Sequence, residues 1–222
     1  QGVAHVPAAE VEAAKAFWVI NKMPPHTVEW LDNALGVGRV VDGKVVFRGP
    51  LRAWPFDGDE GRFEARFEVA GCDLDYHPDW PQAHDLSAEG AFINASMVID
   101  QASGSLVGNR VVRGSGGIPS MKDPVLELDL GGEGDASNWL QFLKATPVQR
   151  SHGDVLFGMS MSGAADVDAR IVIPLRKDLG HSSLEGKALL HGVDFSDAKW
   201  NLAFAQVRGR ADFSDGGFAA DR

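Results

Sequence analysis

Alternation of apolar and polar residues recurs along most of this chain and constrains its fold more than any other feature. Residues 62–69, for example, read Arg-Phe-Glu-Ala-Arg-Phe-Glu-Val. A period of two places apolar side chains on one face of a β-strand and polar side chains on the other. The pattern returns at residues 126–130, 155–161 and 167–175. The sequence therefore predicts a mainly β fold, with about a dozen short antiparallel strands.

Glycines mark where we expect this pattern to be interrupted. Gly71 shifts its phase, because the next apolar row is Cys72, Leu74 and Tyr76, which indicates a β-bulge or a tight turn. Five glycine dipeptides predict turns between strands: Asp42-Gly43, Asp57-Gly58, Ser103-Gly104, Gly116-Gly117 and Asp215-Gly216.

Helical periodicity is confined to three segments. The first 35 residues are predicted to be helical, with one helix over residues 8–21 and a second from Pro25 to Gly36, separated by Pro24-Pro25. A third helix is inserted at residues 135–147, where Asp135 is a good N-cap residue and Pro147 ends the helix.

An internal repeat relates the two halves of the chain. A shift of 121 residues aligns residues 63–100 with 184–221 without a gap and matches Gly71 with Gly192 and Asp73 with Asp194. The expected organisation is a helical segment (1–36), a first β-unit (37–134), the inserted helix (135–147) and a second β-unit (148–222). Such repeats are typical of sheets built by adding similar units.

Charge and composition exclude several classes of protein. Lys and Arg number 21 against 31 Asp and Glu, a net charge of −10, which argues against nucleic-acid binding because phosphate contacts need a basic face. One cysteine allows no internal disulfide and no cysteine-rich zinc site. The chain begins with Gln1-Gly2, and we interpret it as a fragment of a longer protein.

No motif predicts catalysis, a metal or a cofactor. Residues 131–134 lack the Lys and Ser/Thr of a phosphate-binding loop, and residues 158–162 lack the last glycine of a nucleophile elbow. His77 and His84 have nearby aspartates, but their spacing matches no defined metal site. We expect residues 77–81 to form a solvated acidic loop and the protein not to be an enzyme.

The predicted strands expose more apolar surface than three short helices can cover, since each helix is only about 10 Å wide. Two solutions remain open at this point. The sheet closes into a sandwich or barrel with an ordinary core, or it curls into an open groove whose apolar lining holds a ligand.

Several segments resemble one known family. Residues 23–35, 38–49, 54–56, 61–81 and 135–147 are similar to the AsmA-like YhdP family of bacterial envelope proteins. The resemblance implies a long curled antiparallel sheet forming a repeating β-groove. It also implies a periplasmic portion of an inner-membrane-anchored protein that carries phospholipid between inner and outer membranes. Its expected partners are acyl-chain lipids and neighbouring groove repeats, and it implies no catalytic residues or cofactor.

One apolar strand face supplies the candidate groove lining. These candidates are Phe63, Phe67, Val69, Leu74, Phe92, Leu126, Leu128, Phe157, Met159, Ile171, Ile173 and Leu190. The alternative is a closed β-sandwich that binds an envelope protein or a glycan, with a filled interior and an exposed patch at Trp54 and Trp80.

Overall fold

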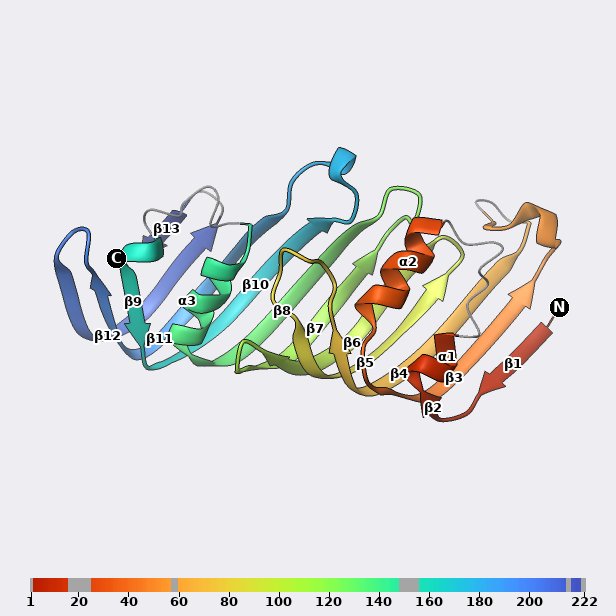
Figure 1. The fold of residues 1–222 in the computed structure, drawn as a ribbon, viewed down its shortest axis with the longest axis horizontal. Helices are drawn as coiled ribbons and strands as arrows, with labels where there is room; N and C mark the ends of the chain where they lie inside the picture. The colour runs from red at the N-terminus through yellow and green to blue at the C-terminus, as the bar shows by residue number, and fades with distance from the viewer. Residues whose placement is uncertain (1, 16–24, 57–59, 148–155, 215–216, 221–222) are drawn as a thin grey trace.

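A computed structural model describes residues 2–15, 25–56, 60–147, 156–214 and 217–220, and most of them belong to one antiparallel sheet (Figure 1). Within these ranges the sheet has thirteen strands: β1 (Gly2–Val6), β2 (Ala9–Glu10), β3 (Arg39–Arg48), β4 (Arg62–Leu74), β5 (Ala83–Ile93), β6 (Ser96–Leu106), β7 (Asn109–Ile118), β8 (Val125–Asp135), β9 (Met159–Ser162), β10 (Ala164–Pro174), β11 (Ser183–Asp197), β12 (Leu202–Ser214) and β13 (Gly217–Ala220).

The strands follow one another as a meander. Their order is β1-β3-β4-β5-β6-β7-β8-β10-β11-β12-β13, while β2 pairs with β3 and β9 pairs with β11. The two ends of this order do not pair with each other, so the sheet is open. Figure 1 places β1 and β12 at opposite ends of the long axis. The mainly β, open antiparallel prediction is confirmed, and the closed-sandwich alternative is wrong.

Within the described residues, three α-helices lie on one face of this sheet, which we call the inner face; the opposite face is the outer face (Figure 1). They are α1 (Val11–Ala14), α2 (Pro25–Ala34) and α3 (Ala136–Ala145). Short 3-10 helices occupy Leu51–Ala53 and Lys177–Leu179. The helices predicted from Pro25 and from Asp135 are confirmed. Asp135 caps α3, because its Oδ1 accepts a hydrogen bond of 2.8 Å from the Ser137 N–H.

The prediction that the whole N-terminal segment is helical is wrong. Residues 2–6 form β1, which pairs with β3, and helix begins only at Val11. Residues 16–21 of the predicted first helix lie outside the described residues. The strand has no buried face to give it a visible period, since Val3 is 64% exposed. Backbone pairing with β3 therefore decides the structure of this segment.

Three predicted turns are also wrong, because the glycine dipeptides lie inside strands. Asp42-Gly43 is in β3, Ser103-Gly104 in β6 and Gly116-Gly117 in β7, while 57–58 and 215–216 lie outside the described residues. Gly116 and Gly117 have φ of 147° and 152°. A Cβ atom on them would collide with the carbonyl oxygens of Glu127 and Met97 in the adjacent strands. These glycines permit close strand packing and do not mark a chain reversal.

The bulge predicted at Gly71 is confirmed and recurs 121 residues later. Gly71 and Gly192 have φ of 61° and 88°, and each lies at a shift in strand register. All eight residue pairs that join β4 to β5 recur between β11 and β12 when 121 is added to each residue number. Val69–Ala88, for instance, becomes Leu190–Gly209. This agreement supports the internal repeat, while the division into four segments stays a prediction.

The main apolar core lies on the inner face. Buried side chains from several strands form one cluster with residues of α3 and of the β4–β5 connection (residues 75–82): Tyr76, Trp80, Met97, Leu106, Ile118, Met121, Leu126, Phe142, Ile171, Ile173 and Leu184. Smaller clusters adjoin α1 and α3. The apolar face of the sheet is therefore packed where these elements cover it.

Candidate functional site

The inner face is the candidate site. The helices α2 and α3 and the β4–β5 connection cover part of it, and the connection joins the two helices. Figure 1 shows this connection in front of the sheet, between α2 and α3. Trp30 of α2 donates a hydrogen bond of 3.0 Å from its Nε1 to the carbonyl oxygen of Tyr76. The ring of Trp80 lies 5.8 Å from that of Phe142 of α3 and 6.3 Å from that of Tyr76. A hydrogen bond from α2 and an aromatic contact with α3 thus link both helices through the connection.

The expectation of a solvated loop at residues 77–81 is wrong at its aromatic position. Trp80 and its neighbour Tyr76 are each only 5% exposed. Burial, with a smaller contribution from Asp75, raises the pKa of Tyr76 well above its ordinary value, so the phenol is neutral at physiological pH. The aspartates on either side had favoured a solvated loop. Only the packing of the connection against the sheet and α3 shows that its aromatic rings are buried.

Backbone hydrogen bonds fix the start of the connection to the end of α2. The Asp75 N–H donates to the carbonyl of Ala34 at 2.8 Å, and the Gly36 N–H donates to that of Asp73 at 2.9 Å. Leu35 and Leu74 form an isolated antiparallel bridge at the same place. The helix and the connection therefore meet the sheet as one unit.

The twelve candidate lining residues are distributed over several environments, all within the described part of the chain. Leu126, Ile171 and Ile173 are at most 3% exposed and belong to the main cluster, against which Leu74, Phe92 and Leu128 also pack. The Phe67 ring lies 5.6 Å from Phe92, and that of Phe63 lies 4.6 Å from Trp54. Val69, Met159 and Leu190 belong to the three smaller clusters.

Phe157 is the exception among these candidates. The strand predicted over residues 155–161 begins only at Met159, and Leu156–Gly158 form a helical turn; Val155 lies outside the described residues. Phe157 is 65% exposed, whereas the flanking Leu156 is buried. A helical turn places adjacent residues in different environments, which a period-two reading of the sequence does not anticipate. The lining role of all twelve residues stays a prediction.

A second feature, a row of small and apolar residues across the sheet, could not be found from the sequence. One residue in each of the strands β4–β8 and β10–β12 pairs directly with the next, in the order Val69, Ala88, Ala102, Gly114, Leu130, Ala169, Gly186 and Phe213. A cavity of about 980 Å³ follows this row. Register between strands defines the row, and no single strand contains a signal for it.

The cavity lies on the outer face. Its other lining residues are mostly charged or polar neighbours of the row, such as Asp168 and Arg170 beside Ala169. Adjacent residues of a strand point to opposite faces. Of the twelve candidates, Val69 alone contributes, and the large inner-face side chains of Leu128 and Ile171 do not line it. The cavity is therefore a trough between two polar rows, with strand backbone as its floor.

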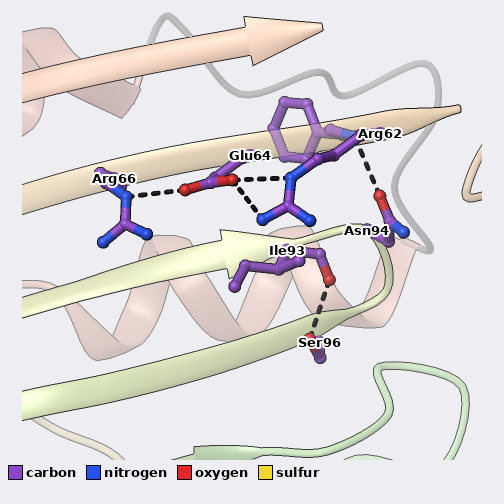
Figure 2. A network of polar contacts seen from close by, with 7 residues as sticks. Arg62, Glu64, Arg66, Ile93, Asn94 and Ser96 are labelled. Atoms are coloured by element: carbon purple, nitrogen blue, oxygen red, sulfur yellow. Dashed lines mark hydrogen bonds and ion pairs between the residues drawn. The ribbon is translucent and has the colours of Figure 1, made fainter. Parts of the chain in front are cut away.

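Ion pairs across strands cover the outer face. Arg170 contacts Glu127 at 2.9 Å, and Arg113 pairs with Asp168. On β4, Glu64 lies between Arg62 and Arg66, at 2.5 and 2.7 Å (Figure 2). Hydrogen bonding to Arg62, opposed by partial burial and aided by Arg66, lowers the pKa of Glu64. This polar surface is typical of a solvated face.

The turn beyond this network ties β4, β5 and β6 together. Figure 2 shows Asn94 Oδ1 accepting a hydrogen bond from the Phe63 N–H, at 2.9 Å, and Ser96 Oγ donating to the Ile93 carbonyl, at 2.8 Å. Asn94 has φ of 50° and Ala95 completes the turn. The chain reverses here without glycine because asparagine tolerates the left-handed region.

Of the histidine and aspartate residues considered as metal ligands, His84 and Asp73 form a side-chain pair. His84 Nδ1 lies 3.0 Å from Asp73 Oδ1, and both side chains are more than one-third exposed. In the described ranges, no group of three or more His, Cys, Asp or Glu residues is placed to hold a metal ion. None of the helices in those ranges is long and apolar enough to cross a bilayer.

Comparison with known proteins identifies the family. A family model described as YhdP protein matches residues 3–222. The chain belongs to the YhdP family. It is 26% identical over 161 residues to a protein of Escherichia coli (strain K12) named "Intermembrane phospholipid transporter YhdP". The match covers 72% of this chain and 13% of that relative. No solved structure matches the chain.

Membership of the YhdP family agrees with the resemblance predicted from residues 23–35, 38–49, 54–56, 61–81 and 135–147. Those segments include the end of β4, the β4–β5 connection and α3, which meet over the inner face. The segments that carried the resemblance are thus also the ones that build the cover of the candidate site. The matched part of this chain spans only 13% of the length of that relative.

Proposed function

We propose that this chain is a non-enzymatic segment of an intermembrane phospholipid transporter and that its inner face shields acyl chains. The observation that carries the proposal is an open sheet with a large apolar cluster on its inner face, in a member of the YhdP family. Support for the cargo comes from the relative, whose name states that it transports phospholipid. Acyl chains need only apolar, non-directional contacts, which such a face supplies.

In this proposal, lipid displaces part of the cover of the inner face, which α3 and the β4–β5 connection form. Ile173 and Leu126 are almost fully buried when α3 and the β4–β5 connection are in place. An acyl chain that replaces part of this cover keeps the same side chains away from water. The lipid must also contact Tyr76, Trp80 and Phe142 of the displaced cover, so that one set of apolar contacts replaces another and little additional apolar surface is buried. Weak net binding of this kind suits a segment that passes lipid onward.

We further propose that neighbouring repeats of the full-length protein extend the sheet at both ends. Support comes from β1, whose residues 2–5 are exposed, and from β12, where β13 pairs only with residues 211–214. The remaining length of β12 offers free backbone groups to another strand. The segment would lie in the periplasm, within a protein anchored in the inner membrane.

A single photocrosslinking experiment tests which lipid binds and which face of the sheet it contacts. Leu128 is partly buried on the inner face, and the adjacent Asp129 is exposed on the outer face. A photoreactive phenylalanine analogue is placed at either position in the protein expressed in bacteria. After irradiation, mass spectrometry identifies attached lipid. We expect phospholipid on the Leu128 variant and almost none on the Asp129 variant.

Two outcomes count against the proposal. Equal labelling at both positions would show that lipid contacts the protein without preference for the inner face. No labelling at Leu128, together with no phospholipid in an organic extract of the purified wild-type protein, would show that the inner face is an ordinary core. A Phe67→Asp variant that unfolds under the same conditions would strengthen that second conclusion.

A further inference from the structure

Trp80 carries an unpaired hydrogen-bond donor inside the apolar cluster. Its side chain is 5% exposed, and its Nε1–H has no hydrogen-bond partner. Among the described residues, no other buried side-chain nitrogen or oxygen lacks a partner. A buried donor without an acceptor is unfavourable, and native proteins keep few of them. The position therefore requires an explanation beyond packing.

Two other tryptophans in the same region show that partners are available locally. Trp30 donates its Nε1–H to the Tyr76 carbonyl at 3.0 Å, and Trp139 of α3 donates to the Ala165 carbonyl at 3.2 Å. Trp80 differs because hydrogen bonds within its own loop hold its backbone in place. Its backbone N–H donates to the His77 carbonyl at 3.0 Å, and the Asp79 N–H donates to His77 Nδ1 at 3.1 Å.

The surroundings of the Trp80 ring restrict what can accept its hydrogen bond. The ring packs between Tyr76 and Phe142 within the largest apolar cluster. A charged acceptor would lose its hydration there at high cost. Among the described residues, no second unpaired buried side-chain group lies beside the Nε1–H to share a bridging water with it. A neutral acceptor on an otherwise apolar molecule fits these surroundings.

An acyl ester carbonyl has this chemistry. We propose that Trp80 Nε1 donates a hydrogen bond to an ester carbonyl of a phospholipid whose acyl chains lie along the inner face. This assignment rests on the proposed function. The β4–β5 connection would then hold the lipid at its ester level, where the apolar chains end and the polar headgroup begins.

Ester and ether lipids separate the hydrogen bond from general apolar binding. Dioleoyl phosphatidylethanolamine and its diether analogue differ in the carbonyl oxygens alone. Each competes with a fluorescent phosphatidylethanolamine for the purified protein, and the dissociation constants are compared. We expect wild-type protein to prefer the diester by about 3–10-fold, the ratio that one net hydrogen bond gives. Trp80→Phe should lose this preference and bind both lipids with the affinity that wild type shows for the diether.

Trp139→Phe is the matched control, since it removes an indole N–H that already has a protein partner. It should keep the preference for the diester. Thermal unfolding checks that both variants are folded. A ¹H–¹⁵N spectrum of the indole groups gives a second measurement on the wild-type protein, because diester lipid should move the Trp80 indole proton downfield and diether lipid should not. This measurement holds even if Trp80→Phe does not fold.

The possible results distinguish this inference from the function on which it rests. Equal affinity of wild type for diester and diether lipid, or an unchanged preference in Trp80→Phe, overturns the role of Trp80 but leaves lipid binding intact. Failure of folded wild-type protein to bind either lipid overturns the proposed function itself.

Discussion

Asp85 and Gln206 lie 121 residues apart and share a left-handed backbone conformation, with φ of 52° and 55°. Residues other than glycine adopt this conformation rarely. Each of the two forms a bulge in the second strand of its hairpin, and Gly71 or Gly192 forms a bulge in the first. The two hairpins therefore repeat in backbone geometry as well as in register, and equivalent substitutions should have equivalent effects.

The bulge glycines provide the first prediction. Gly71→Ala and Gly192→Ala should each lower the free energy of unfolding by about 1–2 kcal/mol, because a Cβ atom is strained at positive φ. No atom lies within 4 Å of a Cβ at Gly71, and only the ends of flexible side chains approach it at Gly192. Urea denaturation of the two variants measures the loss.

Gly117→Ala and Gly2→Ala are the controls for this measurement, with a larger and a smaller expected loss of stability. At Gly117 a Cβ would also collide with the Met97 carbonyl, so the loss should exceed that of Gly71→Ala. Gly2 has open space around it, and Gly2→Ala should leave stability unchanged. If Gly71→Ala were as stable as wild type, the left-handed bulge would not exist in solution.

A second prediction contrasts two candidate lining residues. Ile173 is fully buried in the main cluster, whereas Phe157 is 65% exposed. Ile173→Ala should lower the free energy of unfolding by about 2–5 kcal/mol, through lost apolar contacts and a residual cavity. Phe157→Ala should change it by less than about 0.5 kcal/mol. Chemical denaturation measures the loss of unfolding free energy in both variants. Similar losses would show that Phe157 is buried and that the helical turn at Leu156–Gly158 does not expose it.

A third prediction concerns the pH dependence of the α3 cap. Hydrogen bonds from Ser137, and a weaker one from Gly163, lower the pKa of Asp135 below 3.8 in the folded protein. The cap therefore stabilises the fold fully above that pH and loses its effect as pH falls through the folded-state pKa. Asp135→Ala should cost about 1 kcal/mol at pH 7 and progressively less as the pH falls below 3.8.

Asp135→Asn serves as the control for the cap. Asparagine also caps helices but does not titrate, so this variant should keep most of the stability at pH 7 and show less acid sensitivity than wild type. Thermal unfolding at pH 7, 5 and 3 gives the comparison. A constant difference between wild type and Asp135→Ala over this range would contradict the role of the charge.

A fourth prediction concerns the sole cysteine. Cys72 is fully buried beside Val40, and burial raises the pKa of its thiol. Because the thiolate is the reactive form, a disulfide reagent at pH 8 should label native protein slowly and urea-unfolded protein at once. A Phe157→Cys variant should gain one rapidly labelled thiol. Rapid labelling of Cys72 in the native state would mean that α1 and β3 do not cover it.

The strands and two helices were predictable because their signals are local. Alternation at residues 62–69 requires only that one face of β4 be buried, and Asp135 and Pro25 act within a single helical turn. The bulge at Gly71 was visible because a phase shift in one strand reveals it. Gly116-Gly117 misled the prediction, since close contact between neighbouring strands demands glycine as strongly as a turn does.

By itself, the sequence determined that this chain forms many amphipathic strands, two of its helices and a bulged hairpin that recurs 121 residues later. Only the tertiary structure decided that the sheet stays open, that residues 2–6 add a strand to its edge, and that Trp80 folds inward between Tyr76 and Phe142. The reason is physical. Alternation and capping depend on neighbours in the chain, whereas closure, edge pairing and burial of a loop depend on surfaces that exist only after the strands have assembled.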